Sequence, residues 1–475
     1  MSWLATIVAA HHGSRRPAFY QNGSVLAGAQ VVGKAVCAAE LLADLDVPCG
    51  VGVPALLTTN ADALALLLGG AAANRPLSLL GPRLAVGELA AATRASGSDV
   101  LLAEPGCRAI AAEVALAADV RAVIVPELPT SAQQLPTTPH AVAFYLHTAG
   151  TTAAPKRVPF TDQVLWSRAR LLQQLMRLGP ETTFATGSPL HHIGGLGNLL
   201  ATLTAGGSAV ATTRFSADWW RSLAELPVTH ALLVPTMIEM LLSEDTRFAV
   251  GLHTLIYGAS PIRPQTLARL LDCMPDIDLV NLFGQTEGSP ITCLDAVDHR
   301  IALHRPELLT SVGRAVPGIQ LRIESRDGSD GEVLARGSHL SVTARDGWLH
   351  TGDIGALDDD GYLRLHGRRH DMIIRGGENI YPVEVENVLA EHRSVQAAAV
   401  VGVPDPRLGE TVAAFVVADV TAETLDIQQL RSWCRSRMAG FKVPQHWHVV
   451  DGLPYNAAGK LQRYKLRDAH RDIAG

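Results

Sequence analysis

Short apolar runs alternate with Ala/Leu-rich helical segments between about residue 20 and residue 285, and this alternation most restricts the possible folds. The runs are rich in β-branched residues and end in turn-forming residues, which favours strands. In chain order they are VLLAE, AVIVPEL, AVAFYLHT, TTFATGSPL, SAVATT, HALLVP, HTLIYGAS and DLVNLFG. The pattern predicts an α/β fold with doubly wound, largely parallel sheets, whose ligands bind at loops leaving the strand ends.

The sequence changes character after about residue 310. Short strands separated by turns, as in GDIGALDDDGYLRLHG, predict a small antiparallel unit. From Asp371 onward, VEVENVLAEH predicts a helix, and VQAAAVVGVPD and TVAAFVVAD predict strands of a compact α+β segment. The chain has 475 residues, of which 47% are hydrophobic, so it can form two or three domains with a sizeable core.

Composition narrows the classes of function. The net charge of -6, with 18 histidines, provides no basic surface for nucleic acid. The six cysteines are scattered without a CxxC pair, which indicates a reducing compartment and argues against a zinc site. No apolar run is long enough to cross a membrane, and the first residues lack the order of a signal peptide. We therefore expect a cytoplasmic protein without a membrane partner.

The stretch TAGTTAAPK, residues 148–156, is rich in hydroxyl and small residues that suit a phosphate-binding loop. It does not match the P-loop pattern GxxxxGK[ST], because Lys156 follows a proline and precedes an arginine. Only five of the 40 basic residues are lysines. Lys156 and Lys460 are therefore candidates for loop positions that need a compact, flexible charge.

Seven motifs occur along the chain in a fixed order. They are TAGTTAAPK, PLHHIGGL, GASP, NLFGQTE, WLHTGD, GRRHDMIIRGGENIYPVEVE and NAAGKLQR. Together they resemble the acyl-adenylate-forming (ANL) superfamily, in particular its acyl-CoA synthetase and aryl-CoA ligase branch. The resemblance extends from about residue 20 to the end. It implies an N-terminal domain over residues 1–369, with a small β-barrel-like subdomain at about 310–369, and a mobile C-terminal domain over residues 370–475.

The resemblance implies a two-step ligation. A carboxylate attacks the α-phosphate of ATP and releases pyrophosphate, and the thiol of coenzyme A then takes the acyl group from acyl-AMP. Charge develops on phosphoryl oxygens in the first step, so positioned cations and donors should supply much of the catalysis. ATP, Mg²⁺ and coenzyme A are the implied small molecules. The C-terminal domain would swing about His370 between the two steps.

By this resemblance, one group of candidate residues would surround the phosphates of ATP and the reacting carboxylate. The loop over the β- and γ-phosphates would contain Thr148, Gly150, Thr151, Thr152 and Lys156. Thr286 would donate to the α-phosphate, and Glu287 would hold Mg²⁺, which prefers hard oxygen ligands. Lys460 would bridge the attacking carboxylate and the α-phosphate, and His192 would lie beside the acyl pocket.

The other candidate residues would contact the nucleoside and the thiol arm of coenzyme A. Adenine would contact Gly258, Ala259 and the ring of Phe283. Asp353 would accept hydrogen bonds from both ribose hydroxyls, because a carboxylate offers two acceptors to two donors. Arg368 would contact the ribose or a phosphate. Gly376 and Gly377 would flank the tunnel for the pantetheine arm, where glycine suits a narrow passage.

Several alternatives remain open at this point. Asp353 could be a turn residue, Glu287 an exposed charge, Phe283 a core residue and His192 a structural histidine. Ala149 and Ala153 replace the Ser and Gly of relatives, which predicts a weaker grip on ATP. Arg157 also departs from relatives, which have Gly there. The chain could instead be an adenylation enzyme that loads a carrier protein, or a catalytically weakened pseudoenzyme that binds ligand. We expect an aromatic, alicyclic or medium-chain fatty acid as the acid.

Overall fold

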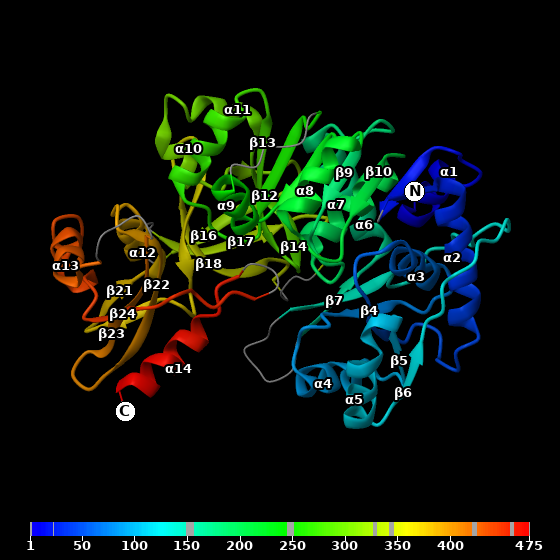
Figure 1. Cartoon of the computed structure of the whole chain (residues 1–475), viewed down its shortest axis with the longest axis horizontal. Helices are drawn as coiled ribbons and strands as arrows, with labels where there is room; N and C mark the ends of the chain where they lie inside the picture. Colours follow the sequence, from blue (N-terminus) through cyan, green and yellow to red (C-terminus); the bar gives the residue numbers. More distant parts are fainter. Residues whose placement is uncertain are drawn as a thin grey trace.

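The computed structural model describes residues 2–21, 23–148, 156–244, 251–325, 330–341, 346–419, 425–456 and 460–474. These residues form four sheets. Figure 1 shows the sheet nearest the C-terminus of the chain at one end of the molecule. We call α1 to β15, residues 3–315, the N-terminal body. The four-stranded sheet over residues 320–368 is the β subdomain, and residues 373–474 form the C-terminal part.

A nine-stranded sheet carries most of the predicted strands. Its central strands β13, β12, β11, β9, β10 and β1 are parallel, and antiparallel strands close both edges. In spatial order the strands are β15 (Arg314–Ala315), β14 (Gly288–Leu294), β13 (Asp278–Gln285), β12 (Thr254–Gly258), β11 (His230–Leu233), β9 (Thr183–Thr186), β10 (Ser208–Ala211), β1 (Pro17–Gln21) and β2 (Ser24–Ala27).

A six-stranded sheet forms the second part of the N-terminal body. In spatial order its strands are β6 (Arg121–Ile124), β5 (Val100–Ala103), β3 (Val53–Leu56), β4 (Leu77–Leu80), β7 (Phe144–Thr148) and β8 (Lys156–Phe160). Only β7 and β8 pair in antiparallel fashion. All eight predicted strand segments therefore form strands of the two large sheets, and the doubly wound α/β prediction is confirmed.

Helices of the N-terminal body cover the two sheets (Figure 1). They are α1 (Trp3–His11), α2 (Gly28–Ala43), α3 (Ala61–Ala72), α4 (Val86–Ser96), α5 (Arg108–Ala118), α6 (Asp162–Met176), α7 (Ile193–Thr204), α8 (Ala217–Ser222), α9 (Pro235–Ser243), α10 (Pro264–Cys273) and α11 (Ala296–Ile301), with short 3₁₀ turns η1 (Pro105–Cys107), η2 (Leu223–Glu225) and η3 (Pro306–Thr310). Side chains of α1, α2, α3, α6 and α7 share one large buried core with strands of both sheets, which joins the sheets into one body.

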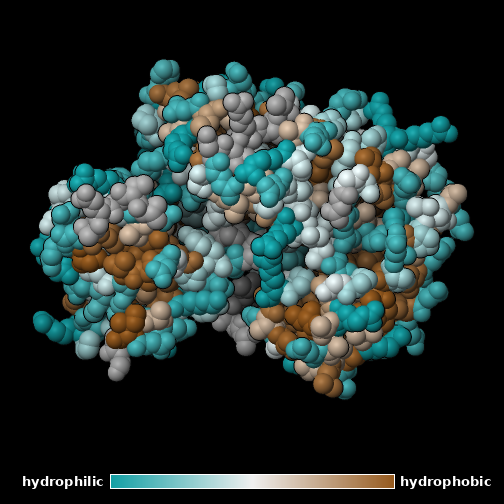
Figure 2. All heavy atoms as spheres, in the orientation of Figure 1, coloured by the Kyte–Doolittle hydropathy of each residue, from teal (hydrophilic) through white to brown (hydrophobic). Residues whose placement is uncertain are grey.

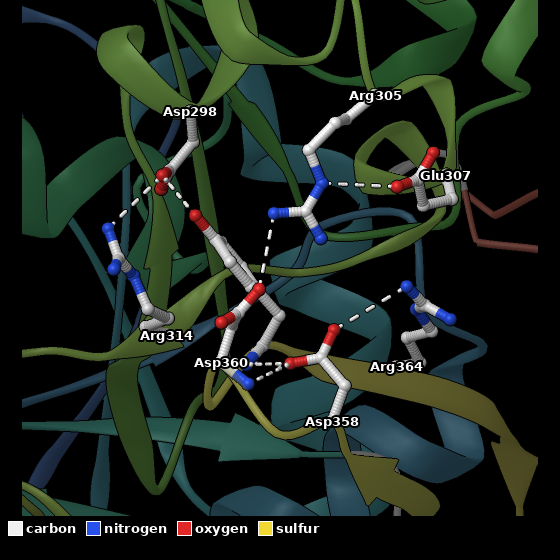
Figure 3. Close-up of polar contacts among 8 residues, drawn as sticks. Asp298, Arg305, Glu307, Arg314, Asp358, Asp360 and Arg364 are labelled. Carbon is white, nitrogen blue, oxygen red and sulfur yellow. Dashed lines mark hydrogen bonds and ion pairs between the residues drawn. The ribbon is translucent and has the colours of Figure 1, made fainter.

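The β subdomain is the antiparallel unit that the sequence predicted. Its strands are β16 (Gln320–Glu324), β17 (Gly331–Arg336), β18 (Leu349–Leu357) and β19 (Leu363–Arg368), paired in that order. Figure 3 shows a polar cluster that attaches it to the N-terminal body. Asp298 at the start of α11 accepts hydrogen bonds from Tyr362 Oη at 2.7 Å and Arg314 Nη2 at 3.1 Å. Arg305 adds an ion pair to Asp360 at 3.2 Å.

The C-terminal part has its own sheet and core. Its elements are β20 (Ile373–Arg375), β21 (Glu378–Ile380), α12 (Pro382–Ala390), β22 (Val395–Asp405), β23 (Gly409–Ala418), α13 (Ile427–Arg435), η4 (Gly440–Lys442), β24 (His446–Val449) and α14 (Arg463–Ala474). β22 and β23 form a long antiparallel pair, and α12 and α13 pack against the same core. The predicted helix and both predicted strands form. Figure 2 shows the surface hollowed between this part and the rest of the molecule.

Among the helices that the structure describes, none combines the length and the apolar character needed to cross a membrane.

Candidate active site

The turn between β13 and β14 holds two of the predicted site residues, Thr286 and Glu287. The antiparallel register of this hairpin shifts between Phe283 and Gln285, just before the turn. The carbonyl oxygen of Glu287 accepts a hydrogen bond from the Ser341 amide at 2.7 Å, which anchors the turn to the β subdomain. Both predicted side chains therefore lie on a short turn that is fixed on one side.

Glu287 is brought together with both described ends of the threonine-rich loop. Its Oε1 accepts from Thr148 Oγ1 at 3.3 Å and lies 4.0 Å from Lys156 Nζ. The Glu287 side chain is 14% exposed, whereas that of Lys156 is 57% exposed. A partly buried carboxylate thus lies beside a hydroxyl and a cation that can still move toward a ligand.

Lys156 is not in a loop, as the sequence suggested, but is the first residue of β8. It pairs with Thr148 at the end of β7, so the loop connects the two strands of a hairpin. Pro159 in the following residues is tolerated because β8 is an edge strand, where a missing amide donor is harmless. Gly150, Thr151 and Thr152, together with Ala149 and Ala153, lie outside the described residues.

Arg157, which departs from the family pattern, points away from this loop. Its guanidinium carbon lies 4.3 Å from the ring centroid of Tyr145, and its Nη1 donates to the Ser96 carbonyl at 3.4 Å. A cation over an aromatic ring is attracted by the negative ring face. The arginine at this position therefore contributes to packing on the six-stranded sheet.

The backbone after β12 is unusual at Gly258 and Ala259. Gly258 has a φ of +158°, and a Cβ there would lie 2.5 Å from the Leu282 carbonyl oxygen. Ala259 has a φ of +69°, a left-handed conformation that costs an L-residue about 1 to 2 kcal/mol. Such strain persists where the surrounding structure enforces it and often marks a ligand site. Phe283, half-buried on the adjacent β13, lies beside this segment.

Asp353 and Arg368 form a pair on neighbouring strands. They are opposite each other in the register of β18 and β19, and Arg368 Nε lies 2.7 Å from Asp353 Oδ1. Asp353 is only 6% exposed, and its Oδ2 has no hydrogen-bond partner among the described atoms. Burial raises the pKa of Asp353 to about 6, although Arg368 and Lys460 act in the opposite direction. A buried carboxylate with a free acceptor is therefore available to a ligand.

Lys460 extends from the C-terminal part into the group just described. Its pKa is lowered by desolvation and by Arg368, and raised by Asp353 and Glu287. The residue keeps exposed surface, although desolvation is the largest cause of its pKa shift and its charge interacts with Arg368, Asp353 and Glu287. The lysine of the last motif thus meets residues of three earlier motifs.

His192 completes this group at the N-terminal end of α7. Burial, followed by the charges of His191 and Lys460, lowers the pKa of His192 to about 3. The rings of His191 and His192 lie 4.4 Å apart, and burial with the charge of Arg83 lowers the pKa of His191 to about 4. Both imidazoles are therefore neutral at neutral pH and can accept or donate one hydrogen bond without repelling Lys460.

Gly376 and Gly377 lie apart from this group, in the turn between β20 and β21. They have φ values of +60° and +91°, which explains the need for glycine. Gly376 donates its amide to the Leu408 carbonyl at 2.8 Å, within the C-terminal part. The structure thus brings Lys460 together with Glu287, Asp353 and Arg368, whereas the hydrogen bond described for the paired glycines stays within the C-terminal part.

The sequence analysis missed one buried cation, Arg168 on α6. The residue is 3% exposed, and burial lowers its pKa to about 9. A signal was present, because Leu165, Arg168, Ala169 and Leu172 share one helix face and only one of the four is polar.

Comparisons with known proteins agree with this arrangement. Residues 7–343 match the model of the AMP-binding enzyme family, and residues 384–460 match that of the AMP-binding enzyme C-terminal domain. The chain belongs to the AMP-binding enzyme family. A 2-succinylbenzoate–CoA ligase from Listeria monocytogenes serotype 4b (strain F2365) is 33% identical to this AMP-binding enzyme over 342 residues, covering 69% of the chain and 70% of the relative.

Relatives and solved structures extend the similarity. The fatty acid–[acyl-carrier-protein] ligase ScoC of Streptomyces coeruleorubidus is 34% identical over 359 residues, with 70% of this chain and 68% of the relative covered. The o-succinylbenzoate CoA synthetase MenE from Bacillus subtilis, solved with its acyl-adenylate intermediate OSB-AMP, has a TM-score of 0.86 and 28% identity, covering 98% of each chain. The amide bond synthetase McbA from Marinactinospora thermotolerans has a TM-score of 0.87 and 29% identity, covering 99% of this chain and 100% of that one.

These findings confirm the resemblance inferred from the motifs. This AMP-binding enzyme is an AMP-forming acid–thiol ligase that uses ATP to activate a carboxylic acid and coenzyme A as the thiol.

Proposed function

We propose that Lys460 drives the adenylation step by stabilising charge between the attacking carboxylate and the α-phosphate of ATP. The supporting observation is the interaction of Lys460 with Asp353, Arg368, Glu287 and His192 in one arrangement of the two parts. A compact ammonium suits a point of growing negative charge. The neutral ring of His192 borders the acid without competing for the negative charge.

The remaining roles follow from the same arrangement. Thr286 donates to the α-phosphate, while Thr148, Gly150, Thr151, Thr152 and Lys156 surround the β- and γ-phosphates. Asp353 accepts the ribose hydroxyls, which is supported by its unpartnered buried Oδ2, and Arg368 holds its other oxygen. Gly258, Ala259 and Phe283 contact adenine, and this contact is consistent with the strained φ of Ala259.

Glu287 fits a magnesium ligand. Its partly buried carboxylate is flanked by a hydroxyl and a movable ammonium, and Mg²⁺ commonly takes one or two carboxylates together with substrate phosphates. The ion would neutralise charge on the phosphates. Glu287 itself would orient the ion, and Thr148 would hold the carboxylate in place.

The second half-reaction uses the other face of the C-terminal part. We propose that residues 370–475 swing as a domain about His370, so that Gly376 and Gly377 replace Lys460 near the acyl-AMP. A carrier-protein pantetheine could use the same passage as coenzyme A, and one relative is named as an acyl-carrier-protein ligase. The enzyme would act in the cytoplasm.

The acid is the least defined component. Curated relatives are named for acids as different as 2-succinylbenzoate, indoleacetate and sulfoacetate, so family membership does not select one. In the first turn of α7, Gly194 would meet nothing within 4 Å if it carried a Cβ, which leaves room beside His192, whereas Gly195 is packed against Ser188. An aromatic, alicyclic or medium-chain acid suits this space.

ATP–pyrophosphate exchange across a panel of acids tests the proposal. We expect exchange with a subset of acids, dependent on Mg²⁺, and thioester formation detected by mass when coenzyme A is added. A phosphopantetheinylated carrier protein and a simple amine, each replacing coenzyme A, test the acceptor. Exchange that persists at full rate in Lys460→Ala would reject the assignment of Lys460. Absence of exchange with every acid would reject catalysis of adenylation by this chain.

A further inference from the structure

Arg168 is a buried cation for which the described structure offers no anion. Among the described residues, no carboxylate pairs with Arg168, its Nε has no hydrogen-bond partner, and burial alone accounts for its lowered pKa. The guanidinium remains charged at neutral pH, since that pKa is about 9. Burying an unpaired charge is strongly unfavourable, so such a group normally meets a partner supplied from elsewhere.

Two neighbouring elements show where Arg168 lies. It packs over Gly197 of α7, where an added Cβ would come within 2.7 Å of Nε and 2.9 Å of Nη2. Its charge also acts on His339, whose Nε2 lies 2.7 Å from the Pro290 carbonyl oxygen at the start of β14. Arg168 therefore packs against α7 and acts on the segment that His339 attaches to β14.

Both elements, α7 and β14, contain or adjoin residues of the candidate active site. Gly197 lies five residues beyond His192, or about 7.5 Å along the helix axis. Gly194, one turn nearer to His192 and on the same helix face, would meet nothing within 4 Å if it carried a Cβ. On the strand side, the Ser341 amide binds the Glu287 carbonyl, which links the segment around His339 to the turn of Glu287. Arg168 is thus one helical turn deeper than the open space next to His192.

Other unpaired polar atoms accompany the guanidinium. Asn198 Oδ1, adjacent to Gly197, and Ser341 Oγ, two residues after His339, are both buried and have no hydrogen-bond partner among the described atoms. Buried polar atoms are nearly always satisfied, so the unsatisfied donors Arg168 Nε and Ser341 Oγ are available to a polar group that enters from outside, whereas Asn198 Oδ1 can only accept. The hydroxyl can donate to an anion, as Arg168 can, and a guanidinium binds a carboxylate through two parallel hydrogen bonds.

We infer that the acid activated by this enzyme carries a second anionic group at its far end, and that Arg168 binds this group. The inference rests on the proposed function, since it concerns the acid of the same site. The helix geometry favours acids whose two acid groups are roughly 6 to 8 Å apart. A linear C6 dicarboxylate and a para-substituted benzene dicarboxylate have this separation.

Matched acids test the inference in the exchange assay. Adipate is compared with its monoamide and with 6-methylheptanoate, and terephthalate with its monoamide and with 4-isopropylbenzoate, so that shape is kept while charge is removed. We expect kcat/KM for the dianionic acid of at least one series to exceed that of its isopropyl counterpart by about tenfold or more. Arg168→Met should lower kcat/KM for the dianionic acid on the order of 100-fold. It should leave kcat/KM for the isopropyl acid unchanged or raise it.

Arg170→Met on the exposed side of α6 is the control, and it should leave this preference unchanged. The apo protein gives an independent readout, because replacing an unpaired buried charge by Met should maintain or raise the melting temperature. If Arg168→Met lowers the melting temperature and reduces all acids alike, Arg168 is structural and the inference is overturned. The inference is also overturned if the wild-type protein and Arg168→Met both prefer the isopropyl acids to the dianionic acids.

Failure of the proposed function gives a different result. If no acid supports exchange, adipate and terephthalate are tested as ligands by thermal shift. Stabilisation of the wild-type protein that is lost in Arg168→Met and kept in Arg170→Met retains the anion site and rejects only the ligase activity. The lack of any shift with either dicarboxylate overturns the anion site as well.

Discussion

The β subdomain and the C-terminal part are both attached to the N-terminal body, but by contacts of different kinds. The β subdomain is held by Asp298, which is 1% exposed and accepts a hydrogen bond from Tyr362 across the junction, beside one from Arg314 of the N-terminal body (Figure 3). Around this carboxylate, Leu294, Ala302, Leu308 and Tyr362 form a small buried cluster. Separation of these surfaces would break the hydrogen bond from Tyr362 and expose the apolar cluster to water, which is unfavourable.

The C-terminal part is attached by contacts near solvent. Arg263 Nη1 donates to the Gln396 carbonyl at 2.7 Å, and the Arg263 side chain is 36% exposed. His366 on β19 lies 3.9 Å from Glu384 on α12, and Lys442 pairs with the same carboxylate. Such contacts exchange readily for water because each is worth at most about 1 kcal/mol.

The difference agrees with the domain movement that we propose. Asp353 and Arg368 belong to the firmly attached β subdomain, so the nucleotide contacts proposed for them would stay in place. Lys460 belongs to the weakly attached part, so it would leave between the two half-reactions. Disturbing the first junction should affect folding, whereas disturbing the second should affect the two half-reactions unequally.

The largest expected effect comes from Lys460→Ala. The variant should lose acyl-AMP formation by a factor on the order of 1,000, because the lysine stabilises charge that develops only in that step. Thioester formation from chemically prepared acyl-AMP should stay near the wild-type rate. Single-turnover assays of the two half-reactions measure both values. Equal losses in both would contradict the division of labour between the two junctions.

His370→Pro should have almost as large an effect, because it restricts the backbone between the two parts rather than removing a charge. His370 is exposed in the turn between β19 and β20, and proline fixes φ near about -65°. One orientation should be trapped, which leaves one half-reaction largely intact and reduces the other roughly 100-fold. His370→Asp is the matched control and should behave like the wild type. Normal rates of both half-reactions in the proline variant would move the pivot to another residue.

Asp298→Ala tests the firm junction. Loss of the carboxylate leaves Tyr362 and Arg314 without their shared acceptor, so the free energy of unfolding should fall by about 2 to 3 kcal/mol. The ratio of the half-reaction rates should not change. Asp360→Ala removes a carboxylate that is 57% exposed, and it should cost less than about 1 kcal/mol. Urea denaturation compares the two variants. If both cost the same, Asp298 does not secure the subdomain.

The smallest effect concerns His366 and pH. Asp330, Glu384, Lys442 and the ring of Tyr381 face this imidazole, and the hydrogen bond to Glu384 raises the pKa of His366. A raised histidine pKa means that the contact is present when His366 is protonated and is lost as pH rises through that value. Because the contact spans β19 and α12, alkaline pH should favour departure of Lys460.

We therefore expect the ratio of thioester formation to adenylation to rise about two- to fivefold between mildly acidic and mildly alkaline buffer. His366→Gln should flatten this dependence. Rates of the separate half-reactions, measured at constant ionic strength, provide the check. A slope that His366→Gln does not alter would assign the pH dependence to another group.

The sequence predicted the fold and the main motifs because both depend on local patterns. Alternating apolar runs predicted the strands, and the order of the motifs predicted that Asp353 and Lys460 would share a site. The prediction that Lys156 lies in a loop was wrong, because the proline-containing stretch after it was not recognised as an edge strand. Sequence patterns carry little information about which strand ends a sheet.

Arg168 could not be recognised in the same way. Its burial depends on Gly197, which is distant in the sequence and provides the space that the guanidinium occupies. The relation between two helix faces is a tertiary feature, and a basic residue in a helix is usually on the solvent side. The residue that we propose to select the acid is therefore less predictable than those that we propose to bind the nucleotide.

With the ribose contact that we propose for Asp353, the burial of this carboxyl couples nucleotide binding to protons. Because burial raises the pKa of Asp353 to about 6, part of the free enzyme carries a protonated carboxyl in mildly acidic solution. Ribose hydroxyls that donate to this group favour its ionised form, so each nucleotide that binds should expel a fraction of a proton. Calorimetric heats of AMP binding near pH 6 should then depend on the ionisation enthalpy of the buffer, and this dependence should vanish in more alkaline solution.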